Sequence, residues 1–491
     1  MWSQKKLSLP RIVFALALFL LLLRLGTALF EYARLASAAL VFPFPLDYGE
    51  GPLLDQAVRL ARFENIYRRD FSTPPYTVSN DPPLFHLIQA PLVRIFGPAF
   101  WYGRLISILS VLTAVVLIGL ILHTVTGDWL ASTIGALTLL SFPYIAQWSV
   151  FARVDTLALA LSLGGLYVIV RDLPDRRALW IAGLLFTAAV YSRPTYMLAA
   201  PLAALAWLWQ AQQRRPAVTL AALVAGSCLG LFLVLNLLTQ GGFYLNVVLA
   251  NASPFSWYTV TYYVADMYVR GGFLVIGCIV FLIVVRLGEP TRSWPLVAPY
   301  VFGAALTVIT AGRAGSSVNH LFEAVTALCL ATGALLAWSR ENDWLKVLMV
   351  FVLAVQINAL TEWSRQEYMP SVMGKVANYR EVAQMAELVR EAPGPVLADE
   401  YMGLLPLAKR RLYFQPVEYR LLQAANLWSE EPLIASIQRE EFSAILLYEP
   451  RTWKAISTRW TPALREAVYA HYRLDKTLAE TFVYLPKHDS R

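Results

Sequence analysis

The chain has 491 residues, of which 57% are apolar and only 15% are charged. Because a soluble globular protein carries about 25% charged residues, this composition excludes an ordinary soluble protein and predicts a chain with many membrane spans. The net charge of +8 indicates loop lysines and arginines that set membrane orientation rather than a nucleic-acid surface. Cys228, Cys278 and Cys329 lie within apolar runs, so they predict neither a disulfide framework nor a metal site.

About eleven apolar runs predict membrane-spanning helices, since a helix needs about 20 apolar residues to cross a bilayer. Some runs are shorter, which thin bilayers and tight hairpins tolerate. After Glu362 the sequence becomes polar and mixed, with no further span. The predicted spans are 11–30, 104–123, 129–147, 155–170, 178–192, 196–210, 217–238, 272–287, 294–311, 320–338 and 344–361.

Basic residues predict the orientation of these spans, because cytoplasmic loops carry the excess of lysine and arginine. We therefore expect a multi-pass plasma-membrane protein with a cytoplasmic N-terminus. An odd number of spans then places residues 362–491 outside, together with the large loop 31–103. The predicted inner residues are Lys5, Lys6, Arg171, Arg176, Arg177, Arg214, Arg215, Arg286, Arg292, Arg340 and Lys346, and the outer ones are Arg153, Arg193, Arg270 and Arg313.

A cleaved signal peptide is the alternative interpretation of the N-terminus, because Ala36-Ser37-Ala38 resembles a cleavage site. The apolar region is too long for a signal peptide, however, and Glu31 and Arg34 interrupt the approach to that site. We therefore expect the first span to be retained.

The loop after the first span holds the first acidic pair of the chain outside the membrane, Asp47 and Glu50. Carboxylates so close to a membrane are costly unless they have partners or a function. The apolar pattern of residues 53–62 predicts an amphipathic helix on the membrane surface. Gly49 and Gly51 would let the backbone turn just before that helix.

Five short motifs follow one another along the chain: Asp47-Tyr48-Gly49-Glu50, Asn80-Asp81-Pro82-Pro83-Leu84, Gly103-Arg104-Leu105, Arg153-Val154-Asp155 and Arg193-Pro194-Thr195. In this order they resemble membrane-embedded GT-C glycosyltransferases. More narrowly, they resemble the protein-mannosyltransferase and aminoarabinose-transferase group, glycosyltransferase families 39 and 83, although many members have lysine in place of Arg193. The resemblance extends over the order of spans to about residue 361 and over the plan of an outer C-terminal domain.

The expected fold is an all-α polytopic membrane domain of the GT-C type over residues 1–361, followed by a small α/β extracytoplasmic domain over 362–491. No nucleophile elbow, zinc spacing or phosphate loop is present in the second domain, so acceptor recognition or a structural cover is its expected role. Its predicted helices are 376–391, 431–440 and 462–472, and its predicted strands are 395–398, 445–448 and 481–485.

The resemblance implies transfer of a sugar from a polyprenyl-phosphate carrier to a hydroxyl group of a lipid, glycan or protein on the outer face. This chemistry needs a base for the acceptor proton and positive charge near the departing phosphate. Asp47 is the expected base, and Glu50 would orient it or bind a divalent ion, for which no requirement is established. A guanidinium group suits phosphate geometry; the expected phosphate ligands are Arg193, Arg313, Arg153 and Arg104.

Simpler roles remain open for these residues. Asp47 would serve as a helix cap, Glu50 would pair with Arg59 or Arg62 in solvent, and Arg104 would extend its charge to the membrane interface. The loop 311–320 would bind an anion through backbone N–H groups or act as a plain turn.

A donor or acceptor loop is expected around Asn319, His320, Glu323 and Asp155. His320 and Glu323 lie three residues apart and would share a helix face. We predict no metal site from them, because a third ligand is not evident.

Other classes of function also fit a polytopic chain. A transporter usually shows internal repeats or broken helices at the bilayer centre, and no clear repeat is present here. A polyprenyl-linked glycan flippase or ligase is a nearer alternative, and a non-catalytic scaffold is the third. Transfer or hydrolysis of a labelled polyprenyl-phosphate sugar would distinguish an enzyme from these. Membrane lipid is the remaining expected partner, and the identity of the sugar is not predicted.

Overall fold

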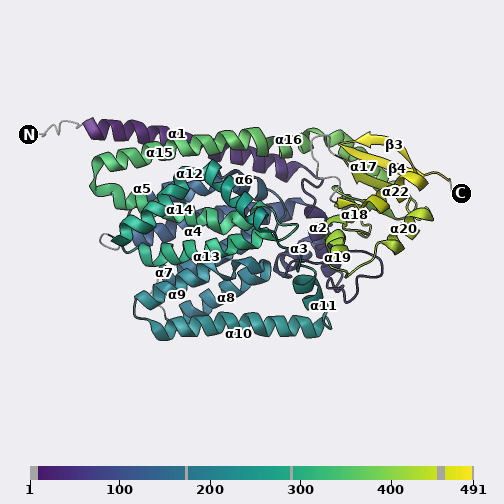
Figure 1. Ribbon diagram of the computed structural model, residues 1–491, viewed down its shortest axis with the longest axis horizontal. Coiled ribbons are helices and arrows are strands. Elements are labelled where there is room, and N and C mark those ends of the chain that lie inside the picture. Colours follow the sequence, from purple (N-terminus) through teal and green to yellow (C-terminus); the bar gives the residue numbers. More distant parts are fainter. Residues whose placement is uncertain (1–8, 172–174, 288–290, 450–458, 489–491) are drawn as a thin grey trace, which may run out of the picture.

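The structure is a computed structural model that describes residues 9–171, 175–287, 291–449 and 459–488. A long bundle of helices forms one end of the molecule, and a small domain with a β-sheet forms the other (Figure 1). The first helix begins at the end of the bundle farthest from the sheet. Lys5 and Lys6, on which the predicted orientation partly rests, lie outside the described residues.

Seven segments of the described chain are long and apolar enough to cross a membrane. They are α1 (Leu9–Val41), α4 (Trp101–Thr126), α10 (Arg214–Leu238), α12 (Trp257–Leu287), α13 (Trp294–Val308) with η3 (Ile309–Gly312), η4 (Val318–Leu321) with α14 (Phe322–Trp338) and η5 (Ser339–Glu341), and α15 (Asp343–Trp363) with η6 (Ser364–Tyr368) and α16 (Met369–Ala377).

The other four predicted runs also form helices, but shorter ones. They are α5 (Trp129–Ser141) with α6 (Pro143–Trp148), α7 (Asp155–Arg171), α8 (Arg176–Ser192), and η1 (Pro194–Met197) with α9 (Ala199–Gln210). Each predicted run thus coincides with a helix, and the protein is an integral membrane protein. How many of the eleven helices cross the bilayer stays a prediction.

Helix α14 occupies the centre of the bundle, because 94% of its most apolar window is buried, compared with 6% for the peripheral α10. Small residues allow neighbouring helices to approach it closely. A Cβ atom on Gly333 would lie 2.5 Å from Leu122 Cδ1, and one on Gly135 would lie 2.9 Å from the Cys329 carbonyl oxygen. The alanines and Gly333 of α14, together with Gly135 of α5, therefore explain its central position.

The segment between α1 and α4 forms two helices, α2 (Glu50–Ala61) and α3 (Leu84–Phe96). The predicted amphipathic helix is present as α2, but the prediction that it lies on the membrane surface is wrong. Nearly all of α2 is buried, because α3 covers one side and the C-terminal domain approaches the other. Gly51 is needed for that approach, since a Cβ atom there would lie 2.7 Å from the Gly403 nitrogen. Helix α3 was not predicted, although Pro82-Pro83 precedes its apolar run.

The C-terminal domain contains a four-stranded sheet in the order β1-β2-β4-β3. Strand β1 (Val396–Ala398) pairs parallel with β2 (Ala444–Tyr448), which pairs antiparallel with β4 (Thr481–Pro486). Strand β3 (Tyr472–Leu478) lies at the edge, antiparallel to β4. The predicted α/β class is confirmed. Strand β3 was missed because five of its seven residues are exposed, so it lacks the apolar signal of a buried strand.

The helices of this domain surround the sheet, and three of them coincide with predictions: α17 (Tyr379–Glu391), α20 (Glu431–Gln438) and α22 (Pro462–His471). The short helices α18 (Leu404–Leu407) and α19 (Pro416–Ala424) were not predicted. Thr461 caps α22, since its side-chain oxygen accepts a hydrogen bond of 3.2 Å from the Leu464 nitrogen.

The first loop and the C-terminal domain share one apolar core. Phe71, Tyr76 and Val78 from the loop belong to the same buried cluster as Phe414 and Trp428. The backbones also join, because the Tyr76 nitrogen donates to the Tyr413 oxygen at 2.6 Å. The loop is therefore a structural part of the outer end of the molecule, and the candidate site lies where these segments meet.

Candidate functional site

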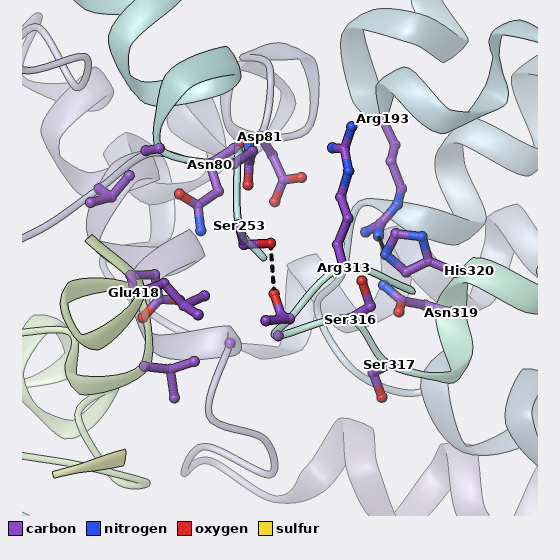
Figure 2. A pocket seen from close by; sticks show the side chains of 18 of the residues that line it. Asn80, Asp81, Arg193, Ser253, Arg313, Ser316, Ser317, Asn319, His320 and Glu418 are labelled. Carbon is purple, nitrogen blue, oxygen red and sulfur yellow. Dashed lines mark hydrogen bonds between the residues drawn. The ribbon is translucent and has the colours of Figure 1, made fainter. Parts of the chain in front are cut away.

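A cavity of about 310 Å³ lies at the junction of the membrane helices, the first loop and the C-terminal domain. We call it the junction pocket. In the view of Figure 2, Arg193, Arg313 and His320 lie on one side of it, and Asn80 and Glu418 lie on the other. The site residues predicted from sequence that line it are Arg153, Arg193, Arg313, Asn319 and His320.

Beneath the junction pocket, Glu50 and Arg104 form an ion pair whose side chains are both fully buried. Both Glu50 carboxylate oxygens accept from Arg104, at 2.8 Å from Nε and 2.7 Å from Nη2. They also accept from the backbone nitrogens of Leu46 and Ala152. Burial opposes ionisation of Glu50, but Arg104 and these amides hold its pKa below the ordinary value.

This geometry does not support two of the predicted roles. Arg104 uses all five of its N–H groups, because it donates to three backbone carbonyls as well as to Glu50, so none remains for a phosphate. Glu50 accepts four hydrogen bonds, so its carboxylate has no free position for a divalent ion. The pair with Arg59 or Arg62 in solvent is also not formed, because Glu50 is buried against Arg104.

Asp47 does not line the pocket itself but pairs with Arg153, which does. The Arg153 Nη2 atom lies 2.8 Å from Asp47 Oδ2, which also accepts from the Gly49 nitrogen at 2.9 Å. Within the described chain, Asp47 Oδ1 has no hydrogen bond. Burial raises the pKa of Asp47, and the Arg153 guanidinium opposes this shift. A carboxylate with a raised pKa and one free oxygen suits proton abstraction.

Gly49 permits this pairing through its size rather than through its backbone angles. Its φ of −75° is available to any residue, so it is not needed for the predicted turn. A Cβ atom at this position would lie 1.9 Å from Arg153 Nη1. The absence of a side chain at residue 49 therefore leaves space for the guanidinium beside Asp47.

The residues on either side of Asp47 are held by the C-terminal part of the chain. Lys375 Nζ donates to the Leu46 carbonyl at 2.9 Å and also pairs with Glu400. The Arg459 guanidinium lies 4.9 Å from the centre of the Tyr48 ring. It also contacts Glu400 at 2.8 Å. These contacts fix Leu46 and Tyr48, and hence the position of Asp47 between them.

Asp155 is buried behind the pocket and positions its basic wall. Its Oδ1 atom lies 2.6 Å from Arg193 Nη1 and accepts from Asn319 Nδ2 at 3.0 Å. Arg193 Nη2 lies 3.0 Å from His320 Nε2. Because arginine only donates, Nε2 must be the acceptor, and Nδ1–H then donates to Thr310 Oγ1 at 2.7 Å. The structure thus joins three of the predicted loop residues to Arg193.

The loop from Arg313 to Ser317 offers free donors to the pocket. In the described part of the chain, the Arg313 side chain makes no hydrogen bond or ion pair. Gly315 has a left-handed φ of +87°, a conformation that glycine adopts without strain. The backbone nitrogens of Gly315 and Ser317 also have no hydrogen-bond acceptor among the described residues. A guanidinium and two free N–H groups in one loop suit an anion.

Glu323 does not belong to the junction pocket. Its side chain is buried in the helical bundle, where Oε2 accepts from Thr307 Oγ1 of α13 at 2.9 Å. His320 is in η4 and contacts Arg193 and Thr310, whereas Glu323 lies in the first turn of α14. The expected contribution of Glu323 to a donor or acceptor loop is therefore not supported.

Asp81 and Glu418 line the pocket but were not selected as site residues from the sequence. The Asp81 carboxylate has no hydrogen bond or ion pair among the described residues, and burial raises its pKa while Arg193 opposes the shift. Glu418 Oε2 accepts from the Tyr48 hydroxyl at 2.6 Å. Asp81 lies in the Asn80-Asp81-Pro82-Pro83-Leu84 motif, from which it could have been selected as a site residue. Glu418 lies in α19, which no sequence pattern predicted.

No group of three His, Cys, Asp or Glu side chains within the described ranges is arranged to hold a metal ion. The three cysteines are free and do not line the pocket.

Comparisons with known proteins show what this chain resembles. The family model of dolichyl-phosphate-mannose-protein mannosyltransferases matches residues 80–239, from Asn80 in the pocket to the end of α10. ArnT from Cupriavidus metallidurans, bound to undecaprenyl phosphate, is 12% identical with a TM-score of 0.61 over 93% of this chain and 97% of that chain. The archaeal oligosaccharyltransferase AglB from Archaeoglobus fulgidus, in complex with an inhibitory peptide and a dolichol-phosphate, is 10% identical with a TM-score of 0.50 over 94% and 74%. No curated protein matches the sequence.

At these identities the solved structures show a shared fold. The resemblance to GT-C enzymes that the sequence motifs indicated is confirmed, as is the fold class of a helical membrane domain followed by a small α/β domain. Together with the family model, the shared fold supports a membrane glycosyltransferase.

We expect Glu50→Ala to destabilise the folded protein by about 3–5 kcal/mol, because it leaves the buried Arg104 charge without its partner. The measurement is thermal unfolding of the purified protein in detergent. Glu387→Ala is the matched control, since Glu387 pairs with Arg390 on the surface. Equal melting temperatures for the two variants would contradict a structural role for the Glu50–Arg104 pair.

Proposed function

We propose that this protein transfers a sugar from a polyprenyl-phosphate donor to a hydroxyl group of a lipid, glycan or protein acceptor. The junction pocket supports this proposal most strongly, because arginines line one side of it and carboxylates line the other. It lies at the ends of membrane helices, where a lipid carrier is able to present its phosphate. ArnT and AglB, which share the fold, were solved with undecaprenyl phosphate and dolichol-phosphate bound.

The donor phosphate binds the Arg313–Ser317 loop and Arg193 in this proposal. Arg313 has the least engaged guanidinium of the wall, whereas Arg193 is held in place by Asp155 and His320. When the bond between the sugar anomeric carbon and the phosphate oxygen breaks, the electron pair stays on that oxygen. Donors already aimed at this position stabilise the growing negative charge. Arg153 is the next arginine in reach of the same cavity.

Asp47 acts as the base that takes the proton of the acceptor hydroxyl as its oxygen bonds to the anomeric carbon. Its free Oδ1 atom and raised pKa support this role, and Arg153 stabilises its position. Asp81 is the competing carboxylate, because it lines the cavity and is not paired. Glu50 and Asp155 are less suited, since their hydrogen bonds occupy both carboxylate oxygens.

Residues 1–361 form the transferase domain in this proposal, and residues 362–491 form an extracytoplasmic domain that completes the pocket. Val417, Glu418, Leu421 and Leu422 of α19 line the cavity opposite the arginine wall. This position suits contact with the acceptor. The N-terminus is cytoplasmic in the plasma membrane, because α1 begins at the end of the bundle opposite this domain and the basic loops favour that side.

Asp47→Asn should lower the initial transfer rate about 10²–10⁴-fold at saturating donor, because general-base catalysis contributes that factor. Donor binding should persist, since the base does not hold the phosphate. The assay is transfer of a labelled sugar from polyprenyl phosphate by purified protein. Asp70→Asn is the matched control, because Asp70 is an exposed residue of the same loop whose carboxylate accepts hydrogen bonds from the neighbouring Ser72. A full rate in Asp47→Asn with a large loss in Asp81→Asn would assign the base to Asp81.

Arg313→Ala should weaken donor binding about ten- to hundredfold, because losing a charge-assisted hydrogen bond costs about 1.5–3 kcal/mol. The readout is the dissociation constant for a labelled polyprenyl-phosphate sugar. Arg69→Ala, which removes an exposed arginine of the first loop, is the control. Unchanged donor affinity in both Arg313→Ala and Arg193→Ala would place the phosphate elsewhere, with Arg153 next in line.

A phosphatase reporter fused after Arg491 should be active, because it requires export and the C-terminal domain is proposed to lie outside. A fluorescent reporter that folds only in the cytoplasm should stay dark at the same position. The same two reporters fused after Gln212, in the short loop between α9 and α10, should give the opposite pattern. Cytoplasmic fluorescence from the Arg491 fusion would overturn the proposed orientation.

A further inference from the structure

A second, smaller cavity of about 180 Å³ lies between the end of α2 and the segment after α18. It shares no lining residue with the junction pocket. We call it the basic pocket. Its lining residues are Asp55, Val58, Arg59, Arg62, Glu64, Lys409, Arg410 and Arg411. Pockets for drug-sized ligands measure about 300–1,000 Å³, so this one suits a smaller group.

The cations of the basic pocket are incompletely paired. Arg62 and Lys409 are exposed, and within the described residues their side chains have no hydrogen bond or ion pair. Arg411 lies 3.9 Å from Glu64 with 64% of its side chain exposed. Arg410 is the exception, because it donates to the carbonyls of Gly394 and Ala392 and so stabilises the C-terminal domain.

Arg59 supplies a buried donor to the same cavity. Only 8% of this residue is exposed, and its Nη2 atom donates to the Asn65 carbonyl at 2.6 Å. Its Nε atom is buried without a hydrogen bond, and the nearest acidic oxygen, on Glu64, is 3.6 Å away. A buried guanidinium nitrogen that lacks an acceptor is costly unless a ligand supplies one. The helix dipole of α2 explains one basic residue at its end, but not the cations contributed by the segment after α18.

The surface next to the basic pocket is apolar. Phe63 directly follows Arg62 and is 85% exposed, and Ile95 and Phe96 at the end of α3 are 71% and 58% exposed. The Arg94 guanidinium lies 5.5 Å from the centre of the Phe63 ring. Exposed aromatic and aliphatic side chains beside arginines are typical of a segment at the membrane–water interface.

We propose that the basic pocket binds the phosphate group of an acidic phospholipid, with the acyl chains lying on Phe63 and the end of α3. The phosphate accepts from Arg59, Arg62 and Lys409, and the pocket size admits a headgroup phosphate. A soluble phosphate has the same charge but no chains to contact the apolar surface. The site is separate from sugar transfer and does not depend on the proposed function.

The test measures binding of dihexanoyl phosphatidylglycerol to the full chain in detergent by native mass spectrometry. The double variant Arg62→Ala/Lys409→Ala should bind at least tenfold more weakly than the parent. Arg473→Ala/Lys476→Ala removes the same charge from the exposed edge strand β3 and should bind like the parent. Equal affinity of the parent and Arg62→Ala/Lys409→Ala would overturn the proposal.

Two further measurements distinguish a phospholipid from soluble phosphate as the ligand of the basic pocket. Phe63→Ser should weaken the phosphatidylglycerol complex and leave the affinity for inorganic phosphate unchanged. Dihexanoyl phosphatidylcholine, which carries no net charge, should bind more weakly than phosphatidylglycerol. If inorganic phosphate binds the parent as tightly as phosphatidylglycerol does, the lipid assignment fails. Melting temperatures equal to the parent's confirm that the variants, all at exposed positions, remain folded.

Discussion

The buried ion pair of Glu50 and Arg104 is the contact on which the outer end of the molecule depends. Removing two charges from water is expensive, and only complete hydrogen bonding compensates for the cost. Here both side chains are fully engaged, because Arg104 binds the carbonyls that end α1, and Glu50 binds the Ala152 amide before α7. One pair thereby joins three segments that are distant in sequence, namely residues 39–50, the start of α4 and the residues before α7, and Asp47 and Arg153 meet as a result.

Carboxylates also hold two arginines that line the pocket. The Asp47–Arg153 pair is partly exposed, whereas Asp155 is buried and binds both Arg193 and Asn319 through Oδ1. Arg313 has a charge that is unmatched by any acidic group of the described chain. Carboxylates neutralise Arg104, Arg153 and Arg193, whereas Arg313 keeps an unpaired positive charge. An anionic ligand needs such an unpaired charge to bind.

Hydrophobic runs were sufficient to predict the eleven apolar segments of the helical bundle and the α/β class, because local sequence composition reflects burial in lipid or in a core. Strand β3 was missed since an exposed edge strand carries no such signal, and α2 was assigned to the wrong surroundings because an amphipathic pattern does not say what covers it. The motifs selected residues several of which lie close together in the structure, but they did not predict the contacts that each residue makes. Whether Arg104 faces a phosphate or Glu50 depends on a contact across 54 residues, which periodicity does not encode.

The core shared by Phe71, Tyr76 and residues 413–428 sets an order for biogenesis. The first loop leaves the translocation machinery early, yet its partners follow more than 300 residues later, as the Val78–Gln415 hydrogen bond spans 337 residues. Until those residues have crossed the membrane, the loop lacks most of the residues of its apolar core, and α19 is absent from the pocket wall. The chain therefore matures as a single unit, and a partly synthesised copy has no complete pocket in which to act on a lipid carrier.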